Sequence, residues 1–182
     1  MTKMVRQPRD NGFTLIELLM VVAMIGVLAA IAAPALLRAR QSGNEASAIS
    51  SLRTVVSAQY MYGASCGGGF FAPSLTALGT APAGASPFIG PDLGSANVSV
   101  KASYTVTIGS SSGADAMSPG SCNGVAAGTG TTGYWATATP TASAGSKAFG
   151  VNTLTTIYSA LQQTPLAMTD NTAPAGAVPI PQ

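Results

Sequence analysis

The stretch GFTLIELLMVVAMIGVLAAIAAPALL, residues 12–37, decides how the rest of the chain is organised. Between residues 13 and 37, only Thr14 and Glu17 carry polar side chains. As a helix, these residues would extend about 37 Å, at roughly 1.5 Å per residue, and a bilayer core requires about 20 apolar residues. The stretch therefore predicts a transmembrane helix.

Basic residues in front of this helix predict its orientation. Lys3, Arg6 and Arg9 precede it, and the positive-inside rule then places the N-terminus in the cytoplasm and the rest of the chain outside. A conventional cleaved signal peptide is the alternative, with Ala29–Ala33 as its small-residue cleavage site. The apolar region of such a peptide normally spans about 7–15 residues, so the length of this run favours a membrane anchor.

Glu17 is the unusual residue of the apolar run. An unpaired carboxylate within lipid costs at least a few kcal/mol, so an acid at this place indicates a function. A cut between Gly12 and Phe13 would create an α-amine one helical turn away, in the same chain or in a neighbouring copy, to pair with Glu17. The uncut chain offers no such amine. The alternative is that Glu17 lies at the membrane interface and extends its carboxylate to water.

The sequence GFTLIELL followed by about 20 apolar residues resembles the class III prepilin signal of type IV pilins and type II secretion pseudopilins. The resemblance covers residues 6 to about 62 and implies a membrane peptidase that cuts after Gly12 and methylates the new N-terminal Phe13. It also implies that Glu17 recruits an incoming subunit through the neighbour's N-terminus. Gly26 and Pro34 match family positions that bracket a stretch prone to lose helicity in filaments.

The fold class that we expect is α+β, with one long N-terminal helix packed on a small antiparallel sheet, as in pilins. In residues 38–62 an apolar stripe at Ile49, Leu52, Val56 and Tyr60 has helical spacing. Ala, Ser and Gln occupy the other face, so we expect one helix over residues 13–62.

Residues 63–182 are expected to form the globular head. It begins with a Gly- and Pro-rich loop that includes one short helical turn at residues 74–79 and ends in a Pro-rich tail. Apolar residues alternate along residues 97–108, which predicts one strand with Val98, Val100, Tyr104 and Val106 on the same face. Further strands are predicted at residues 133–140, 146–151 and 154–160. The whole division is a leader at residues 1–12, a membrane helix at 13–37, an amphipathic helix at 38–62 and the head.

Cys66 and Cys122 are the two cysteines of the chain. Outside the cytoplasm an even pair predicts a disulfide, which would tie the end of the long helix to a later loop. Two buried free thiols are the alternative.

The composition argues against an enzyme. The chain has no histidine, which removes the commonest general base and metal ligand. Asp92, Asp115 and Asp170 are too scattered to argue for a metal site. The GTGTTG motif at residues 128–133 precedes a predicted strand instead of following one, so it does not predict nucleotide binding. Beyond the first twelve residues the positive and negative charges balance and no basic patch is evident, which makes nucleic acid an unlikely partner. We therefore expect no cofactor.

Two structural functions compete. The first is a subunit of a type IV pilus that self-assembles through its apolar helix into a surface filament for adhesion, motility or DNA uptake. The second is a pseudopilin of a type II secretion system, which forms a periplasmic pseudopilus. Major pseudopilins usually carry a calcium site of acidic residues near the C-terminus, for which Asp170 alone is a poor match. A third possibility is a surface binding domain on an uncleaved anchor.

The implied partners are other copies of the chain, the prepilin peptidase, the membrane before assembly, and the inner-membrane pilus or secretion machinery. The implied location is the inner membrane before assembly, with a cytoplasmic N-terminus, and afterwards the cell surface or the periplasm.

Overall fold

The computed structural model describes residues 12–141 and 145–181. The chain divides into two compact units, one ending at Ala39 and the other spanning Arg40–Gln182. Helix α1 (Leu15–Ser65) passes through both, and two short helices, α2 (Leu75–Gly79) and α3 (Pro91–Gly94), follow it in the second unit. The expected helix over residues 13–62 is thus present, shifted by two or three residues at each end.

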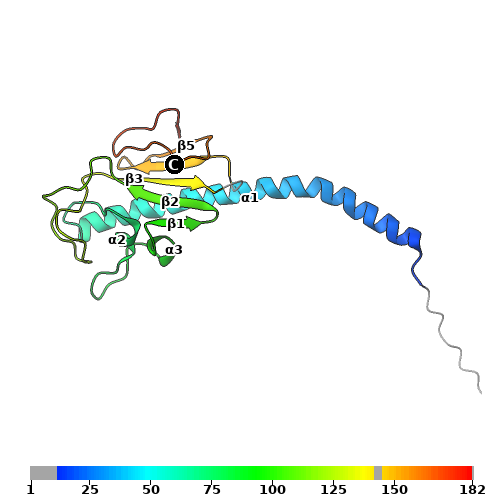
Figure 1. Ribbon diagram of the computed structural model, residues 1–182, viewed down its shortest axis with the longest axis horizontal. Helices are drawn as coiled ribbons and strands as arrows, with labels where there is room; N and C mark the ends of the chain where they lie inside the picture. Colours follow the sequence, from blue (N-terminus) through cyan, green and yellow to red (C-terminus); the bar gives the residue numbers. More distant parts are fainter. Residues whose placement is uncertain (1–11, 142–144, 182) are drawn as a thin grey trace, which may run out of the picture. The chain divides into compact units, whose positions relative to one another are not determined.

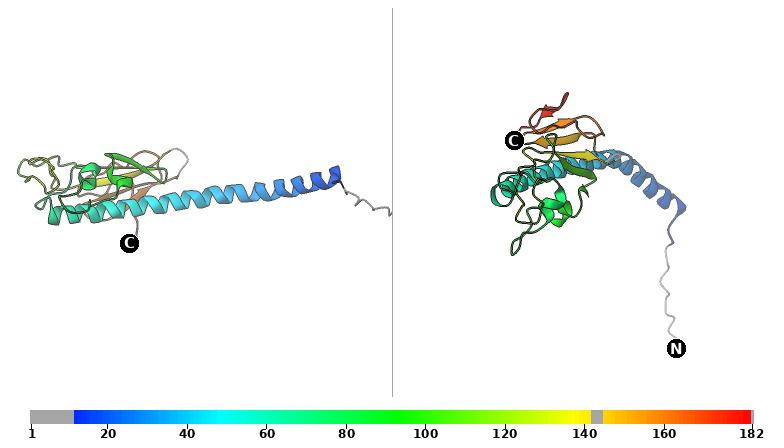
Figure 2. Two further views of the ribbon diagram at one scale, coloured as in Figure 1. Left: turned by 90° about the horizontal axis from the view of Figure 1, so that it is seen from below. Right: turned by 60° about the vertical axis from the view of Figure 1, so that its left-hand side comes forward.

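Among the described residues, six strands form one antiparallel sheet in which strand order follows chain order (Figure 1). The strands are β1 (Val98–Lys101), β2 (Tyr104–Gly109), β3 (Trp135–Pro140), β4 (Ala148–Asn152), β5 (Ile157–Ala160) and β6 (Val178–Pro179). Figure 2 shows the head part of α1 lying along one face of this sheet. The predicted α+β, pilin-like fold class is confirmed.

The core of the head lies between α1 and the sheet. Leu52, Val55 and Tyr62 of the helix are almost fully buried, together with Val106 and Val151 of the strands. Each such side chain contributes roughly 1.5–3 kcal/mol by leaving water. The head therefore has a hydrophobic core of its own.

The predicted stripe on α1 was only partly right. Leu52 is buried, but Tyr60 is 44% exposed, and Gln59, which the prediction placed on the polar face, is fully buried. Its side chain donates from Nε2 to the carbonyl of Ala72 (2.9 Å) and accepts from the Ala72 N–H (2.8 Å). A buried polar group persists when its hydrogen bonds are satisfied, and this partner lies in a loop 13 residues further on. The helical pattern does not reveal it.

The predicted strand at residues 97–108 is a hairpin, and the predicted common face was wrong. Ala102 and Ser103 form a two-residue turn with φ of 48° and 60°, so Ser99 pairs with Val106 and Val100 with Thr105. Because the chain reverses at this turn, the odd-numbered residues of β1 share a face with the even-numbered residues of β2. Val98 and Val100 are consequently exposed, opposite the face of Tyr104 and Val106.

The turn lacks the Asn-Gly or Asp-Gly pair that usually marks such hairpins. Its support comes from a distant residue, because the carbonyl of Ser103 accepts hydrogen bonds from both N–H and Oγ1 of Thr141 (2.9 and 2.8 Å). The other predicted strands correspond to β3, β4 and β5, and the predicted helical turn corresponds to α2.

Two short elements arise from segments that were assigned to loop or tail. Helix α3 lies in the Gly- and Pro-rich segment and contacts both α2 and β1. At the contact with α2, Gly79 faces Gly94 so closely that a Cβ on Gly79 would overlap the carbonyl of Gly94. Strand β6 lies in the Pro-rich tail and pairs with β5.

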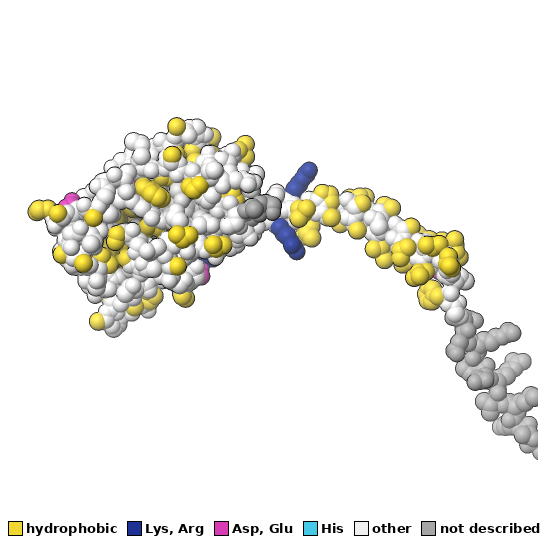
Figure 3. All heavy atoms as spheres, in the orientation of Figure 1, with side chains coloured by type: hydrophobic (Ala, Val, Ile, Leu, Met, Phe, Trp, Pro, Cys, Tyr) yellow, Lys and Arg dark blue, Asp and Glu magenta, His cyan; other side chains and the backbone are white. Residues whose placement is uncertain are grey.

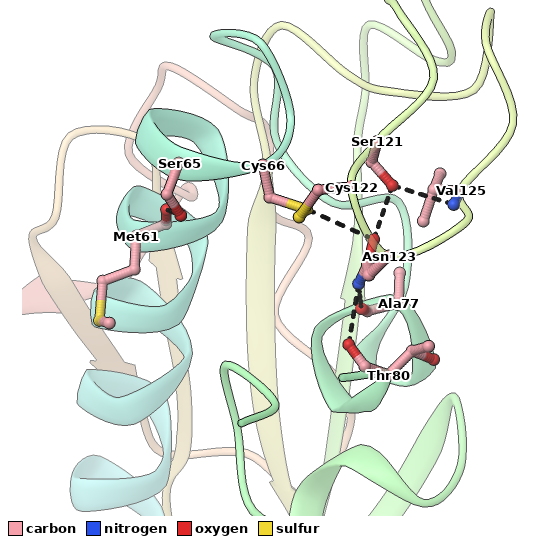
Figure 4. The surroundings of a disulfide bond; sticks show 9 residues. All are labelled: Met61, Ser65, Cys66, Ala77, Thr80, Ser121, Cys122, Asn123 and Val125. Carbon is pink, nitrogen blue, oxygen red and sulfur yellow. Dashed lines mark hydrogen bonds between the residues drawn. A yellow bond between two sulfur atoms is a disulfide. The ribbon is translucent and has the colours of Figure 1, made fainter. Parts of the chain in front are cut away.

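The predicted disulfide is confirmed. Cys66 and Cys122 are bonded, with their Cα atoms 4.9 Å apart. Beside it, Asn123 donates from Nδ2 to the carbonyls of Ala77 (2.6 Å) and Thr80 (3.0 Å), as Figure 4 shows. The loop that carries Cys122 is therefore fixed both to the end of α1 and to α2.

Candidate functional site

The N-terminal unit exposes an apolar surface. Every side chain described in residues 12–39 is exposed, including Leu15, Ile25 and Leu37. Figure 3 shows hydrophobic side chains around this part of the helix. Helix α1 is long and apolar enough to cross a membrane. A monomer cannot leave such a surface in water without a large cost, so it requires lipid or other protein chains around it.

The predicted cleavage site lies just outside the helix. Gly12, Phe13 and Thr14 have no helical assignment, and α1 begins at Leu15. The Phe13 side chain is 85% exposed. The Gly12–Phe13 peptide bond thus stands clear of regular structure, which is the condition in which a protease groove can bind the backbone.

Glu17 has partners within its own chain. Its Oε2 accepts hydrogen bonds from the Thr14 N–H (3.0 Å) and from Thr14 Oγ1 (2.7 Å), and Thr14 Oγ1 lies 3.3 Å from the Glu17 N–H. This reciprocal arrangement is a capping box, and it satisfies donors at the start of α1.

The partner predicted for Glu17 was an α-amine, and the contact with Thr14 was not predicted. The signal was present, because Thr-x-x-Glu in front of an apolar run is the sequence signature of a capping box. Cleavage after Gly12 and pairing of Glu17 with an N-terminal amine both remain compatible with this geometry. The carboxylate is held at the very beginning of the helix, next to the residue that would become the N-terminus.

Gly26 and Pro34 both lie inside α1, which continues through them. Pro34 has no N–H to donate to the carbonyl of Ala30, and Gly26 lowers the helix propensity of its turn. A Cβ built at Gly26 meets nothing within 4 Å, so the single chain offers no packing reason for the glycine. The loss of helicity at these positions in a filament stays a prediction.

In the head, Asp170 is a structural anchor that sequence reasoning missed. The residue is only 3% exposed, and its carboxylate accepts four hydrogen bonds from the loop that follows β2. The donors are Ser110 Oγ, Ser111 N–H, Ser112 N–H and Ser112 Oγ, at 2.7–3.0 Å.

The ionised state of Asp170 is favoured by these donors. Burial by itself raises the pKa of the Asp170 carboxyl, but the hydrogen bonds from Ser111, Ser112 and Ser110 outweigh it, and the pKa is lowered. The acid that was too isolated to predict a metal site thus ties the C-terminal segment to the loop after β2. The run of three serines carries no sequence signal for this contact.

Comparison with known proteins identifies the N-terminal segment. Residues 7–33 match the family model described as the prokaryotic N-terminal methylation motif. Over 52 residues the chain is 46% identical to the type IV major pilin protein PilA of Myxococcus xanthus. It is 49% identical over 52 residues to the type IV wide pilus major component PilA4 of Thermus thermophilus. In this segment, the chain is similar to type IV pilins.

The likeness to these pilins is confined to one part of the chain. The aligned stretch is 29% of this chain and covers 24% of the Myxococcus pilin and 40% of the Thermus pilin. No solved structure matches the chain. The likeness to pilins therefore rests on the apolar helix and the methylation motif at its start, and it does not extend to the head.

Proposed function

We propose that the chain is a structural subunit of a type IV pilus. The observation that carries this proposal is the wholly exposed apolar surface of residues 12–39, which begins at a methylation motif and contains one acidic side chain, Glu17. In a filament, such helices bury their apolar surfaces against each other after leaving the membrane. The names of the two aligned relatives, both major pilus components, support the same role.

The proposed maturation starts in the membrane. The chain inserts with its N-terminus in the cytoplasm, and a prepilin peptidase removes residues 1–12 by cutting between Gly12 and Phe13. The same enzyme methylates the amine of Phe13. Inner-membrane assembly machinery then adds the subunit to the base of the filament, and the head at residues 63–182 faces outward.

Glu17 is proposed to change partners during this process. Before assembly its carboxylate is satisfied by Thr14, which lowers the cost of keeping an acid near lipid. After the cut, the charged amine of Phe13 on a neighbouring chain is a stronger partner, because it adds the attraction between two opposite charges to the hydrogen bond, and this attraction is large in low-dielectric surroundings. The exchange would set the register of each incoming subunit.

The second candidate is a pseudopilin of a type II secretion system, since the motif and the apolar helix serve both classes. Mass spectrometry distinguishes them. We expect filaments sheared from the producing cells to contain, in quantity, a peptide that begins at Phe13 with a methylated amine. The same peptide confined to the envelope fraction would favour the pseudopilin. A protein that still begins at Met1 would contradict both and would leave an anchored surface domain.

A further inference from the structure

The loop around Met117 presents an apolar side chain on a rigid support. Met117 is 85% exposed, more than any other large apolar side chain described in the head. The Met117 N–H donates to Asp115 Oδ1 (2.8 Å), and the Asp115 N–H donates to the carbonyl of Gly130 (2.8 Å). Ser118 closes the loop by donating its N–H to the Asp115 carbonyl and accepting at Oγ from the Gly130 N–H.

The hydrogen bonds of Asp115, Met117 and Ser118 order this loop before any partner binds. A loop that is already ordered loses little conformational entropy when it meets a partner. Asp115 places a carboxylate next to the exposed methionine, and the described residues offer it no cation within ion-pair distance. The loop tip therefore combines one apolar and one acidic group, and we call residues 115–117 the knob.

A hollow that carries a basic side chain, where the knob carries an acidic one, lies beside α1. Arg53, Val56 and Ser57 of the helix line it together with Thr155 and Ile157, and its volume is about 390 Å³. Within the described part of the chain, Arg53 forms no ion pair. Apolar surface continues past the hollow at Tyr60 and Leu154, which are 44% and 54% exposed. The Tyr60 hydroxyl donates to the Thr153 carbonyl (2.8 Å) and so holds the turn between β4 and β5 against the helix.

Knob and hollow are different surfaces of one head. The knob belongs to the loop that is joined to the end of α1 by the Cys66–Cys122 bond. Arg53 lies twelve residues before Ser65, the last residue of α1, which is about 18 Å along the helix axis. A contact between two distinct surfaces repeats from copy to copy, and it generates an open helical array when the rotation between copies does not close into a ring.

We propose that the knob of one copy docks into the hollow of a second copy, with Met117 against Val56 and Ile157 and Asp115 beside Arg53. The occupant is a second copy because the same chain carries both halves of the complementary pair, one acidic and one basic, each next to apolar surface. This inference rests on the proposed function, since it requires copies arrayed along a filament. It assigns a head-to-head contact in addition to the bundled N-terminal helices.

Engineered cysteines test the contact in the full-length protein on cells. In the double variant Met117→Cys with Ser57→Cys, oxidation is expected to give a ladder of multimers larger than dimers that collapses under reductant. Either single variant should give dimers at most. The matched control is Met117→Cys with Ser95→Cys, which places the second thiol at the end of α3, next to β1 and several strands away from β5, and should give no ladder. The absence of a ladder from the test pair, or an equally strong ladder in the control, would overturn the proposal.

A second variant measures the contribution of the knob. Met117→Ser removes the exposed apolar group without touching the core and is expected to lower the yield of sheared filaments about fivefold, which corresponds to about 1 kcal/mol. Leu161→Ser, at a side chain that is 79% exposed elsewhere, should leave the yield unchanged. Normal yield from Met117→Ser, together with filaments of the Met117→Cys, Ser57→Cys variant that show no ladder, would refute the docking and leave the pilin function intact. Absence of wild-type filaments together with absence of a ladder would refute both.

Discussion

At the scale of single residues, the proposed assembly depends on Glu17. Substitution Glu17→Ala removes the carboxylate that would pair with a neighbour's N-terminus but leaves Gly12 and Phe13 in place. We expect normal cleavage and at least a tenfold loss of filaments, which corresponds to about 1.4 kcal/mol per added subunit. Cleavage is read from the size on a gel and assembly from the sheared fraction. Glu45→Ala, a carboxylate outside the apolar run, is the matched control, and undiminished filaments in Glu17→Ala would contradict the pairing.

Gly12 is the residue before the proposed cut. Gly12→Leu adds a side chain where the peptidase must bind extended backbone, so we expect the leader to remain attached. Immunoblotting should then show only the longer precursor. Gly43→Ala, in an exposed part of α1, should be processed to the mature size. A mature-size band from Gly12→Leu would show that this glycine does not determine cleavage.

Asp170 allows a prediction about stability and pH. Asp170→Asn replaces an acceptor by an NH₂ group that faces the donors of Ser110–Ser112, and it should lower the free energy of unfolding by about 1–3 kcal/mol. Because the pKa of Asp170 is lowered in the folded state, its stabilisation is complete above the unfolded pKa, at about pH 4, and is lost as the pH falls through the folded value.

Urea unfolding of the head in the detergent-solubilised chain, at several pH values, measures both effects. The difference between wild type and Asp170→Asn should be constant near neutral pH and shrink below about pH 4. Asp115→Asn keeps the oxygen that accepts from the Met117 N–H and should change stability by less than about 0.5 kcal/mol. A difference that grows at low pH would exclude Asp170 as the source.

At the scale of elements, the disulfide joins the end of α1 to the loop that follows β2. It closes a loop between residues 56 positions apart, for which the chain-entropy model gives up to about 4 kcal/mol. Replacing both cysteines by serine should therefore lower the midpoint of thermal unfolding clearly. Reductant should lower the midpoint of the wild type in the same way and have no effect on the double variant. Equal midpoints for all three samples would show that the bond adds no stability.

Prediction of elements succeeded where local sequence dominates. The apolar run, the strands rich in Val, Tyr and Thr, and the short turn at α2 are specified by periodicity and turn residues. It failed at β1 and β2, where a turn without glycine depends on Thr141 about 40 residues away. It also failed at Gln59, whose burial depends on the backbone of Ala72. Such contacts have no local signature.

At the scale of the whole molecule, the division into two units predicts that the head can fold without the membrane helix. A chain of residues 40–182 retains the buried side chains of α1, the sheet and the disulfide. We expect it to be a soluble monomer with a cooperative thermal transition, measured by circular dichroism and size-exclusion chromatography. An aggregated product without a transition would show that the core requires the N-terminal helix.

The sequence by itself determined the length of the N-terminal segment, its apolar character and the motif around Gly12, Phe13 and Glu17. These are properties of a continuous stretch of chain, so they do not depend on packing. Only the tertiary structure decided that Asp170 binds three serines and that Gln59 is buried against the backbone of Ala72. Each of these arises because folding brings together donors, acceptors and apolar groups whose partners the local pattern of the chain does not specify.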